Sequence, residues 1–261
     1  MKTKVRHILE AILGAVLTAC IICAFVAGRE SRADLRCTDV VIEITDSVEN
    51  SFVSVTDINR YLDREYGAYI GEPLDSLDLT RIEKIIDGRS AVMKSEAFVT
   101  RDGLLHIKVC QRKPIVRFQV QGGGFYADAE GFIFPLQNSY SSHVQVVDGE
   151  IPIAANSGYK GKIEDSQQEQ WLRSVLAVVR HIDESRTWKG KIVQISASRN
   201  GELILIPRVG QERFLFGQPS GIKDKFMKME KYYTTIVPEK GKEYYRYVDL
   251  RFKDQIVCRQ K

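Results

Sequence analysis

The pattern of apolar and polar positions separates an apolar N-terminal run from a longer region of mixed periodicity. Residues 11–28 read AILGAVLTACIICAFVAG, without a charged residue, and two more apolar residues extend the run past Glu10. About 20 consecutive apolar residues are needed to cross the hydrocarbon core of a bilayer. The pattern therefore predicts a transmembrane helix at residues 8–28, preceded by a short tail at residues 1–7.

Charge orients this segment. Basic residues precede it, whereas the basic residues that follow it are offset by Glu30 and Asp34. The positive-inside rule then predicts a cytoplasmic tail and an external location for the rest of the chain. Two alternatives stay open: a cleaved signal peptide, and a lipoprotein whose cleavage box would be LTAC at residues 17–20. The apolar run is longer than that of a signal peptide and places Phe25 or Val26 where a small residue is needed, and it continues past the lipoprotein box. Both observations favour an uncleaved single-span anchor.

The region after the apolar run begins with the signals of a compact α+β domain at residues 37–112. Residues 37–45 alternate and are rich in β-branched side chains, as in a strand. Residues 56–67 and 78–88 each carry an apolar stripe at helical spacing and end at a glycine. Two further alternating runs flank an Asp-Gly pair, which is a strong hairpin signal. The predicted element order is β-α-α-β-β.

The remaining residues, 113–261, predict a mixed β domain with two flanking helices. Pro114 marks the junction between the two domains. The helices are predicted at residues 165–185 and 220–241, where apolar side chains recur at helical spacing. The other segments alternate like strands, and several meet at turn sequences such as Asn-Gly. The sequence thus predicts an α+β protein: a transmembrane helix, a β-α-α-β-β domain and a C-terminal mixed β domain.

The chain closes on YRYVDLRFKDQIVCR, an alternating stretch where most chains lose their pattern. Alternation predicts that Val248 and Leu250 face the core. It predicts that Tyr245, Tyr247 and Arg251 face outward. An open strand edge is a template for pairing with another chain. This stretch is therefore a candidate partner-binding strand, and the alternative is that its outward residues are ordinary exposed positions.

Net charge narrows the classes of partner. The chain has a formal net charge of +4, with 44% hydrophobic and 28% charged residues, an ordinary globular composition. Four basic residues against one acidic residue in the first 29 positions account for most of the excess. Acidic and basic residues are interspersed in the rest of the chain, without a basic stripe. The composition therefore argues against nucleic-acid binding.

The residue patterns that would carry catalysis or metal binding are missing. The four histidines lack metal-ligand spacing, and no serine lies in a GxSxG elbow. The QGGGFY stretch lacks the lysine and the following helix of a phosphate loop. The cysteines outside the apolar run, Cys37, Cys110 and Cys258, form no CxxC pair, so both a disulfide and free thiols stay open. We predict no catalytic residue, cofactor, metal or small-molecule substrate.

Three strings carry a resemblance to one family of bacterial proteins. QRKPIVRF, residues 111–118, resembles that family's junction between domains. FYADAEGFIFPL, residues 125–136, resembles its Tyr-x-Asp-x-x-Gly turn, and YVDLRF, residues 247–252, resembles its C-terminal signature. With the order of span, small domain and β domain, the sequence resembles the cell division family FtsQ/DivIB, in a form similar to that of Bacteroidota. Residues 138–159 match no family position that we can name.

The resemblance implies a non-enzymatic divisome scaffold, held in the inner membrane at the septum with its C-terminal domain in the periplasm. It implies that the small domain is a POTRA domain. The implied partners are FtsB- and FtsL-like single-span proteins, and through them FtsW and FtsI, which make septal peptidoglycan. The family contacts FtsB with its last strands and the preceding helix. The matching positions here are Arg251, Phe252 and Asp254, to which the alternation adds Tyr245 and Tyr247.

Two other functions remain as alternatives. A POTRA-bearing envelope protein that assists outer-membrane protein assembly or secretion would normally carry several POTRA repeats or a β-barrel. The single module and the two later helices argue against it. A membrane-anchored periplasmic hydrolase would need a catalytic set that the sequence does not show.

Overall fold

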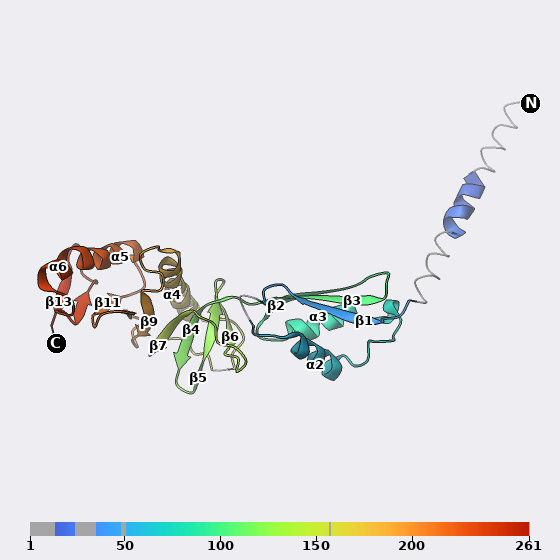
Figure 1. Ribbon diagram of the computed structural model, residues 1–261, viewed down its shortest axis with the longest axis horizontal. Coiled ribbons are helices and arrows are strands. Elements are labelled where there is room, and N and C mark those ends of the chain that lie inside the picture. Colours follow the sequence, from blue (N-terminus) through green and yellow to red (C-terminus); the bar gives the residue numbers. More distant parts are fainter. Residues whose placement is uncertain (1–13, 24–34, 48–50, 157, 261) are drawn as a thin grey trace, which may run out of the picture. The chain divides into compact units, whose positions relative to one another are not determined.

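The computed structural model describes residues 14–23, 35–47, 51–156 and 158–260 (Figure 1). Residues 14–23 are helical. Within these described ranges, no helix is long and apolar enough to cross a membrane. The transmembrane helix expected at residues 8–28 extends outside the described residues at both ends, so it stays a prediction.

The chain divides into two compact units, of which the first comprises Met1–Ser47 and Val53–Gln111. Its sheet has three strands in the order β1-β3-β2, with β1 parallel and β2 antiparallel to β3. This is the β-α-α-β-β order that the sequence predicts, with one added 3-10 turn. The elements are β1 (Asp39–Ile44), α2 (Val55–Glu65), η1 (Leu74–Ser76), α3 (Leu79–Asp87), β2 (Val92–Val99) and β3 (Leu104–Gln111).

Short-range signals in the sequence explain the two helices of this unit. Ser54 caps α2, because its hydroxyl accepts a hydrogen bond from the Asp57 amide while the Asp57 carboxylate accepts one from the Ser54 amide. Asp78 caps α3 by accepting from the amide of Arg81. Both helices bury an apolar stripe, and β3 buries alternate residues. The fully buried residues of this core include Ile58, Leu62, Ile82, Ile86, Leu105, Ile107 and Val109.

The second unit comprises Val48–Phe52 and Arg112–Lys261. Its sheet has ten strands in the order β13-β12-β11-β10-β9-β7-β4-β5-β6-β8. The elements are β4 (Pro114–Val120), β5 (Gly123–Asp128), β6 (Phe132–Pro135), β7 (Gln145–Gly149), β8 (Gly161–Lys162), α4 (Ser166–Glu184), β9 (Ile192–Ala197), β10 (Leu203–Pro207), β11 (Arg213–Gly217), α5 (Ile222–Lys231), η2 (Tyr232–Ile236), α6 (Val237–Lys240), β12 (Tyr247–Asp249) and β13 (Val257–Arg259).

Helix α4 supplies the centre of the second core. Asp165 caps it with hydrogen bonds from two amides of its first turn. Its apolar face is buried against the sheet, and the indole N–H of Trp171 donates to the carbonyl of Gly201 at 2.9 Å. This bond ties the start of α4 to the turn of the β9–β10 hairpin. The Asn-Gly turn that the sequence predicts at this hairpin is confirmed.

One expectation for the C-terminal region is confirmed and another is wrong. The helix predicted at residues 220–241 is helical without a break from Ile222 to Lys240, although five of its residues form the π-helical turn η2 between α5 and α6. Pro238 has no amide hydrogen to donate to the carbonyl four residues before it, which accounts for the local change in hydrogen bonding. The strand expected in the closing stretch is shorter than its alternation, since β12 has three residues.

Candidate partner-binding surface

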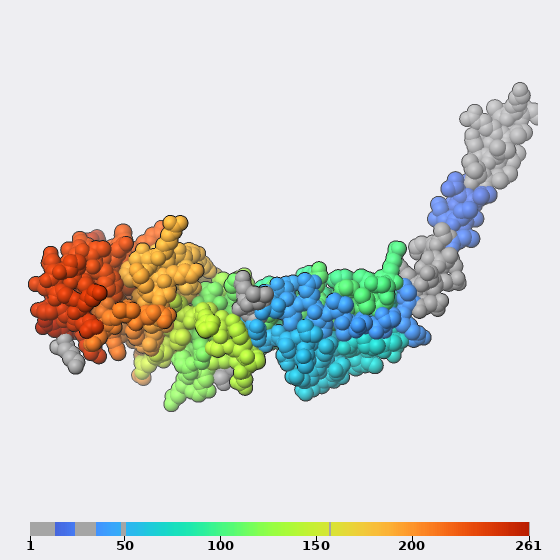
Figure 2. Space-filling model, viewed as in Figure 1, coloured from blue at the N-terminus to red at the C-terminus, as the bar shows by residue number. Residues whose placement is uncertain are grey.

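The closing stretch forms two strands at one end of the second sheet. β12 pairs in parallel with β11 and antiparallel with β13, and β13 is the terminal strand. Val248 and Leu250 are fully buried, as the alternation predicts. The space-filling view shows the exposed atoms of the region from α5 to β13 in red (Figure 2). The sequence therefore ends on a strand that carries an edge of the sheet.

Hydrogen bonding shows which backbone groups of β13 face outward. The Arg213 amide donates to the Arg246 carbonyl, and the Leu250 amide donates to the Leu215 carbonyl. The backbone groups of the even-numbered residues, in β12 and directly beside it, are therefore directed toward β11. The backbone groups of the odd-numbered residues of β12 are then directed toward β13, where Tyr247 pairs with Arg259 and Asp249 pairs with Val257. It follows that the amide and carbonyl of Cys258 point to the open edge.

Arg251 lies beyond β12 and binds a buried acid of that strand. Its Nε and Nη2 donate to Asp249 at 2.9 and 2.7 Å, and its Nη1 lies 3.3 Å from Glu202 Oε2. Burial disfavours the ionised Asp249, but the hydrogen bonds from Arg251 outweigh it and hold the pKa of this carboxyl below its ordinary value. The alternation placed Asp249 on the outward face, whereas the structure buries it under Arg251.

The other positions assigned by the resemblance lie in the turn between β12 and β13. Phe252 is 44% exposed, and its carbonyl accepts a hydrogen bond from Lys228 of α5 at 2.9 Å. Asp254 is exposed and has a positive φ of 59°, as expected of a turn residue. Phe252 does not join the buried side of the strand, because β12 ends at Asp249 and the alternation stops there.

The two tyrosines are half-buried. Tyr247 lies under the guanidinium of Arg259, whose Cζ is 5.6 Å from the ring centroid. Tyr245 packs against the core and meets Tyr244 edge-on. The structure thus gathers Tyr247, Arg251 and Phe252 around β12, and it adds residues that sequence reasoning missed. These are Lys228, Glu202 and Arg259, which no local pattern could have brought together because they come from α5, the β9–β10 turn and β13.

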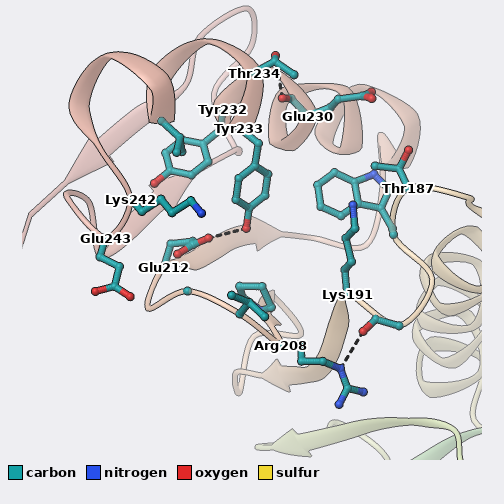
Figure 3. Close-up of a pocket in the computed structure, with 16 residues that line it drawn as sticks. Thr187, Lys191, Arg208, Glu212, Glu230, Tyr232, Tyr233, Thr234, Lys242 and Glu243 are labelled. Atoms are coloured by element: carbon teal, nitrogen blue, oxygen red, sulfur yellow. Dashed lines mark hydrogen bonds between the residues drawn. The ribbon is translucent and has the colours of Figure 1, made fainter.

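A cavity of about 540 Å³ lies elsewhere in the second unit, walled by the η2 turn and the β10–β11 connection (Figure 3). Glu212 is buried in its wall, and the hydroxyl of Tyr233 points at this carboxylate and donates to it at 2.5 Å. Burial, followed by the nearby Glu212 carboxylate, raises the pKa of Tyr232 to about 12 and raises that of Tyr233 further.

The cavity offers no recognisable catalytic set. Its buried acid, Glu212, is bonded to a tyrosine, and its other polar residues do not form a nucleophile–base pair. In the part of the chain that the structure describes, no three histidine, cysteine, aspartate or glutamate side chains come together as metal ligands. The three cysteines outside the apolar run are all free.

Comparison with families of known proteins decides the assignment. The POTRA-like domain family matches residues 35–110, and the family described as FtsQ/DivIB, C-terminal related, matches residues 113–259, which is more than half of the chain. The chain belongs to the FtsQ/DivIB-related family. This family consists of non-catalytic scaffold proteins of cell division that act through protein–protein interactions. Comparison with curated proteins one by one gave no match.

Proposed function

We propose that this protein is a divisome scaffold that binds FtsB- and FtsL-like single-span proteins through the β12–β13 end of its second unit. Through these partners it helps to assemble and regulate FtsW and FtsI, which synthesise septal peptidoglycan. The observation that carries the proposal is the open edge of β13 beside the turn that holds Arg251 and Phe252, within the region matched by the family.

The chemistry of this edge suits an added strand. The outward amide and carbonyl of Cys258 offer ladder hydrogen bonds, while the half-buried Cys258 side chain packs against the core. Phe252 offers an exposed aromatic ring next to the edge, and aromatic and arginine side chains are frequent hot spots in interfaces. Arg251 and Arg259 favour a partner segment that carries carboxylates.

The membrane anchor completes the proposal. Residues 8–28 would hold the protein in the inner membrane, with residues 1–7 in the cytoplasm and the POTRA-like and C-terminal domains in the periplasm at the division septum. A scaffold with this layout needs no cofactor, nucleic acid or small-molecule substrate.

Depletion of the protein in its native bacterium tests the role. We expect filamentous cells, and midcell localisation of a fluorescent fusion before depletion. Co-purification of the full-length chain with FtsB- and FtsL-like partners from detergent extracts tests the interaction. Normal division after depletion would refute the role, and a partner-free protein would refute the interaction.

A further inference from the structure

The cavity beside the η2 turn holds a buried carboxylate in a fixed position. Glu212 is 5% exposed, and the hydroxyl of Tyr233 donates to its Oε1 at 2.5 Å, a length typical of a bond to an ionised carboxylate. Gly210 makes room for this acid, because it has a φ of 104° and a Cβ atom there would lie 2.2 Å from Glu212 Oε2. The tyrosine and the glycine turn therefore hold the carboxylate in the cavity wall.

No cation of the described chain neutralises this acid. Among the residues that the structure describes, Glu212 forms no ion pair, and its side chain accepts one hydrogen bond, from a neutral phenol. A carboxylate has about four lone-pair sites for donors, and buried charges in proteins are normally paired. Glu212 therefore keeps the capacity to bind a positively charged group that enters the cavity.

Aromatic rings form part of the wall beside this acid. Trp188, Tyr232 and Tyr233 all line the cavity (Figure 3). The ring centroids of Trp188 and Tyr233 are 6.0 Å apart, and those of the two tyrosines are 5.3 Å apart. The face of an aromatic ring attracts a cation, most strongly where water is excluded. A buried carboxylate and a group of rings in one cavity are the chemistry that binds an organic cation.

Three other charged residues of the lining point elsewhere. Figure 3 shows the charged ends of Arg208, Glu230 and Glu243 directed away from Tyr233. All three residues are exposed, and the Nε of Arg208 donates to the carbonyl of Gly190 at 3.0 Å. These groups therefore lie in water and contribute little to the charge inside the cavity.

Two lysines of the lining oppose a cation only weakly. Lys191 and Lys242 are both exposed, and in the described part of the chain neither ammonium group forms an ion pair, with Glu212 or with another acid. Water and salt screen exposed charges far more than buried ones. The buried carboxylate therefore decides which sign of charge the interior of the cavity attracts.

We propose that this cavity binds a small organic amine, with its ammonium group against Glu212 and its apolar body beside the rings of Trp188 and Tyr233. The volume of about 540 Å³ lies in the range of small-molecule sites. The lining includes none of the residues assigned to the partner surface around β12, and the proposal does not depend on the function proposed for that surface.

Three probes with one apolar body test the proposal. They are 3-phenylpropylamine, 3-phenyl-1-propanol and 3-phenylpropanoate, each titrated into the full-length protein in detergent micelles. The NMR signal of the Trp188 indole N–H reports binding, and that of Trp171, which is bonded to the Gly201 carbonyl, is the reference. We expect the amine to shift the Trp188 signal and to bind at least about tenfold more tightly than the alcohol. Equal binding of these two, tighter binding of the carboxylate, or no saturable shift would overturn the proposal.

A variant of the acid gives the second test. Glu212→Gln keeps an oxygen that can accept the Tyr233 hydroxyl and removes the charge, so binding of the amine should fall at least about tenfold while binding of the alcohol stays the same. Both proteins are measured in the same micelles, so loss of probe to the detergent is equal. Glu243→Gln, at an exposed acid of the same lining, is the matched control and should change the affinity by less than about twofold. Equal effects of the two variants contradict the proposal.

Two further measurements keep the test decisive. If Glu212→Gln unfolds the second unit, Lys242→Met decides, because removal of an exposed positive charge should strengthen binding of the amine by about two- to threefold. Unchanged or weaker binding by that variant contradicts the proposal. The end-blocked peptide Ala-Leu-Lys-Leu-Ala carries the same ammonium group on a polypeptide. Tighter binding of this peptide than of the free amine would assign the cavity to a protein partner and overturn a small-molecule site.

Discussion

Arg251 clamps the buried carboxylate of Asp249, two residues before it in the chain, with bonds of 2.9 and 2.7 Å. In the sequence these residues form part of the VDLR string that resembles a family signature. In the structure the arginine is also an internal counter-ion, and 42% of its side chain stays exposed. Its role as the counter-ion of Asp249 and its proposed role in contacting a partner therefore need separate tests.

Replacing Arg251 should destabilise the second unit. Arg251→Ala leaves the Asp249 carboxylate buried without its donors, and we expect a loss of about 2 kcal/mol in the free energy of unfolding, less than for a fully buried pair because the guanidinium is half exposed. Urea unfolding measures the loss. The double variant Asp249→Asn/Arg251→Ala should recover part of it, because no buried charge is left unpaired; equal losses in the two variants would contradict the clamp.

Replacing Phe252 should affect binding and leave the fold intact. The ring is 44% exposed and its one tertiary hydrogen bond uses the backbone carbonyl, so Phe252→Ala should change stability by less than about 0.5 kcal/mol. Loss of an exposed aromatic at an interface should weaken binding of an FtsB-like partner by about 1–2 kcal/mol, roughly 5- to 30-fold.

Val209→Ala is the matched control for Phe252→Ala. Val209 is an exposed apolar residue of the same unit, 81% exposed, in the connection between β10 and β11. Its replacement should leave the affinity for the partner unchanged when both variants are compared by surface plasmon resonance. Equal affinity of Phe252→Ala and the parent protein removes Phe252 from the partner surface.

Asp249 should make stability depend on acid pH. Its folded-state pKa is lowered, so it contributes stability above the unfolded pKa of about 3.9, and this contribution is lost as the pH falls through the lower folded value. Thermal unfolding measured between pH 6 and pH 3 should show a smaller fall in Tm for Asp249→Asn than for the parent. Parallel Tm curves would show that the folded carboxyl titrates normally.

The bond between Tyr233 and Glu212 should stabilise the cavity wall. Tyr233→Phe removes the hydroxyl that donates to the buried Glu212 carboxylate, and we expect a loss of about 2 kcal/mol in unfolding free energy. The adjacent Tyr232→Phe removes a hydroxyl that bonds no described side chain, so its cost should be much smaller. Similar losses in denaturant titrations of the two variants would contradict a specific role for the Tyr233 bond.

The same pair should make the fold sensitive to alkali. The pKa of Tyr233 is raised, so the folded state favours the neutral phenol; this stability is complete below the unfolded pKa of about 10 and is lost as the pH rises beyond it. Absorbance at 295 nm should show a late phase of tyrosine ionisation that coincides with unfolding, and Tyr233→Phe should reduce that phase. Ionisation of all tyrosines in one phase near their ordinary pKa would refute the raised pKa of Tyr233.

Local pattern was sufficient for most elements of both domains. Helical spacing located α2, α3 and α4, and an Asp-Gly or Asn-Gly pair located two hairpins, because these signals act between residues a few positions apart. The same reasoning placed Val248 and Leu250 in the core. It did not anticipate the π-helical turn η2 inside the predicted helix, and it failed at the end of β12, where the loss of a pairing partner ended a strand that periodicity alone would continue.

By itself, the sequence determined the order of the elements, the faces that are buried and the short motifs that resemble the family, since each depends on residues close together in the chain. Only the tertiary structure decided which strands are edges and which edges are open. Glu83 and Asp87 of α3 close β2, while β1 and β13 keep outward backbone groups. Pairing across a sheet joins residues far apart in the chain, and neither the position of an edge nor a side chain that reaches it from a helix leaves a periodic signal.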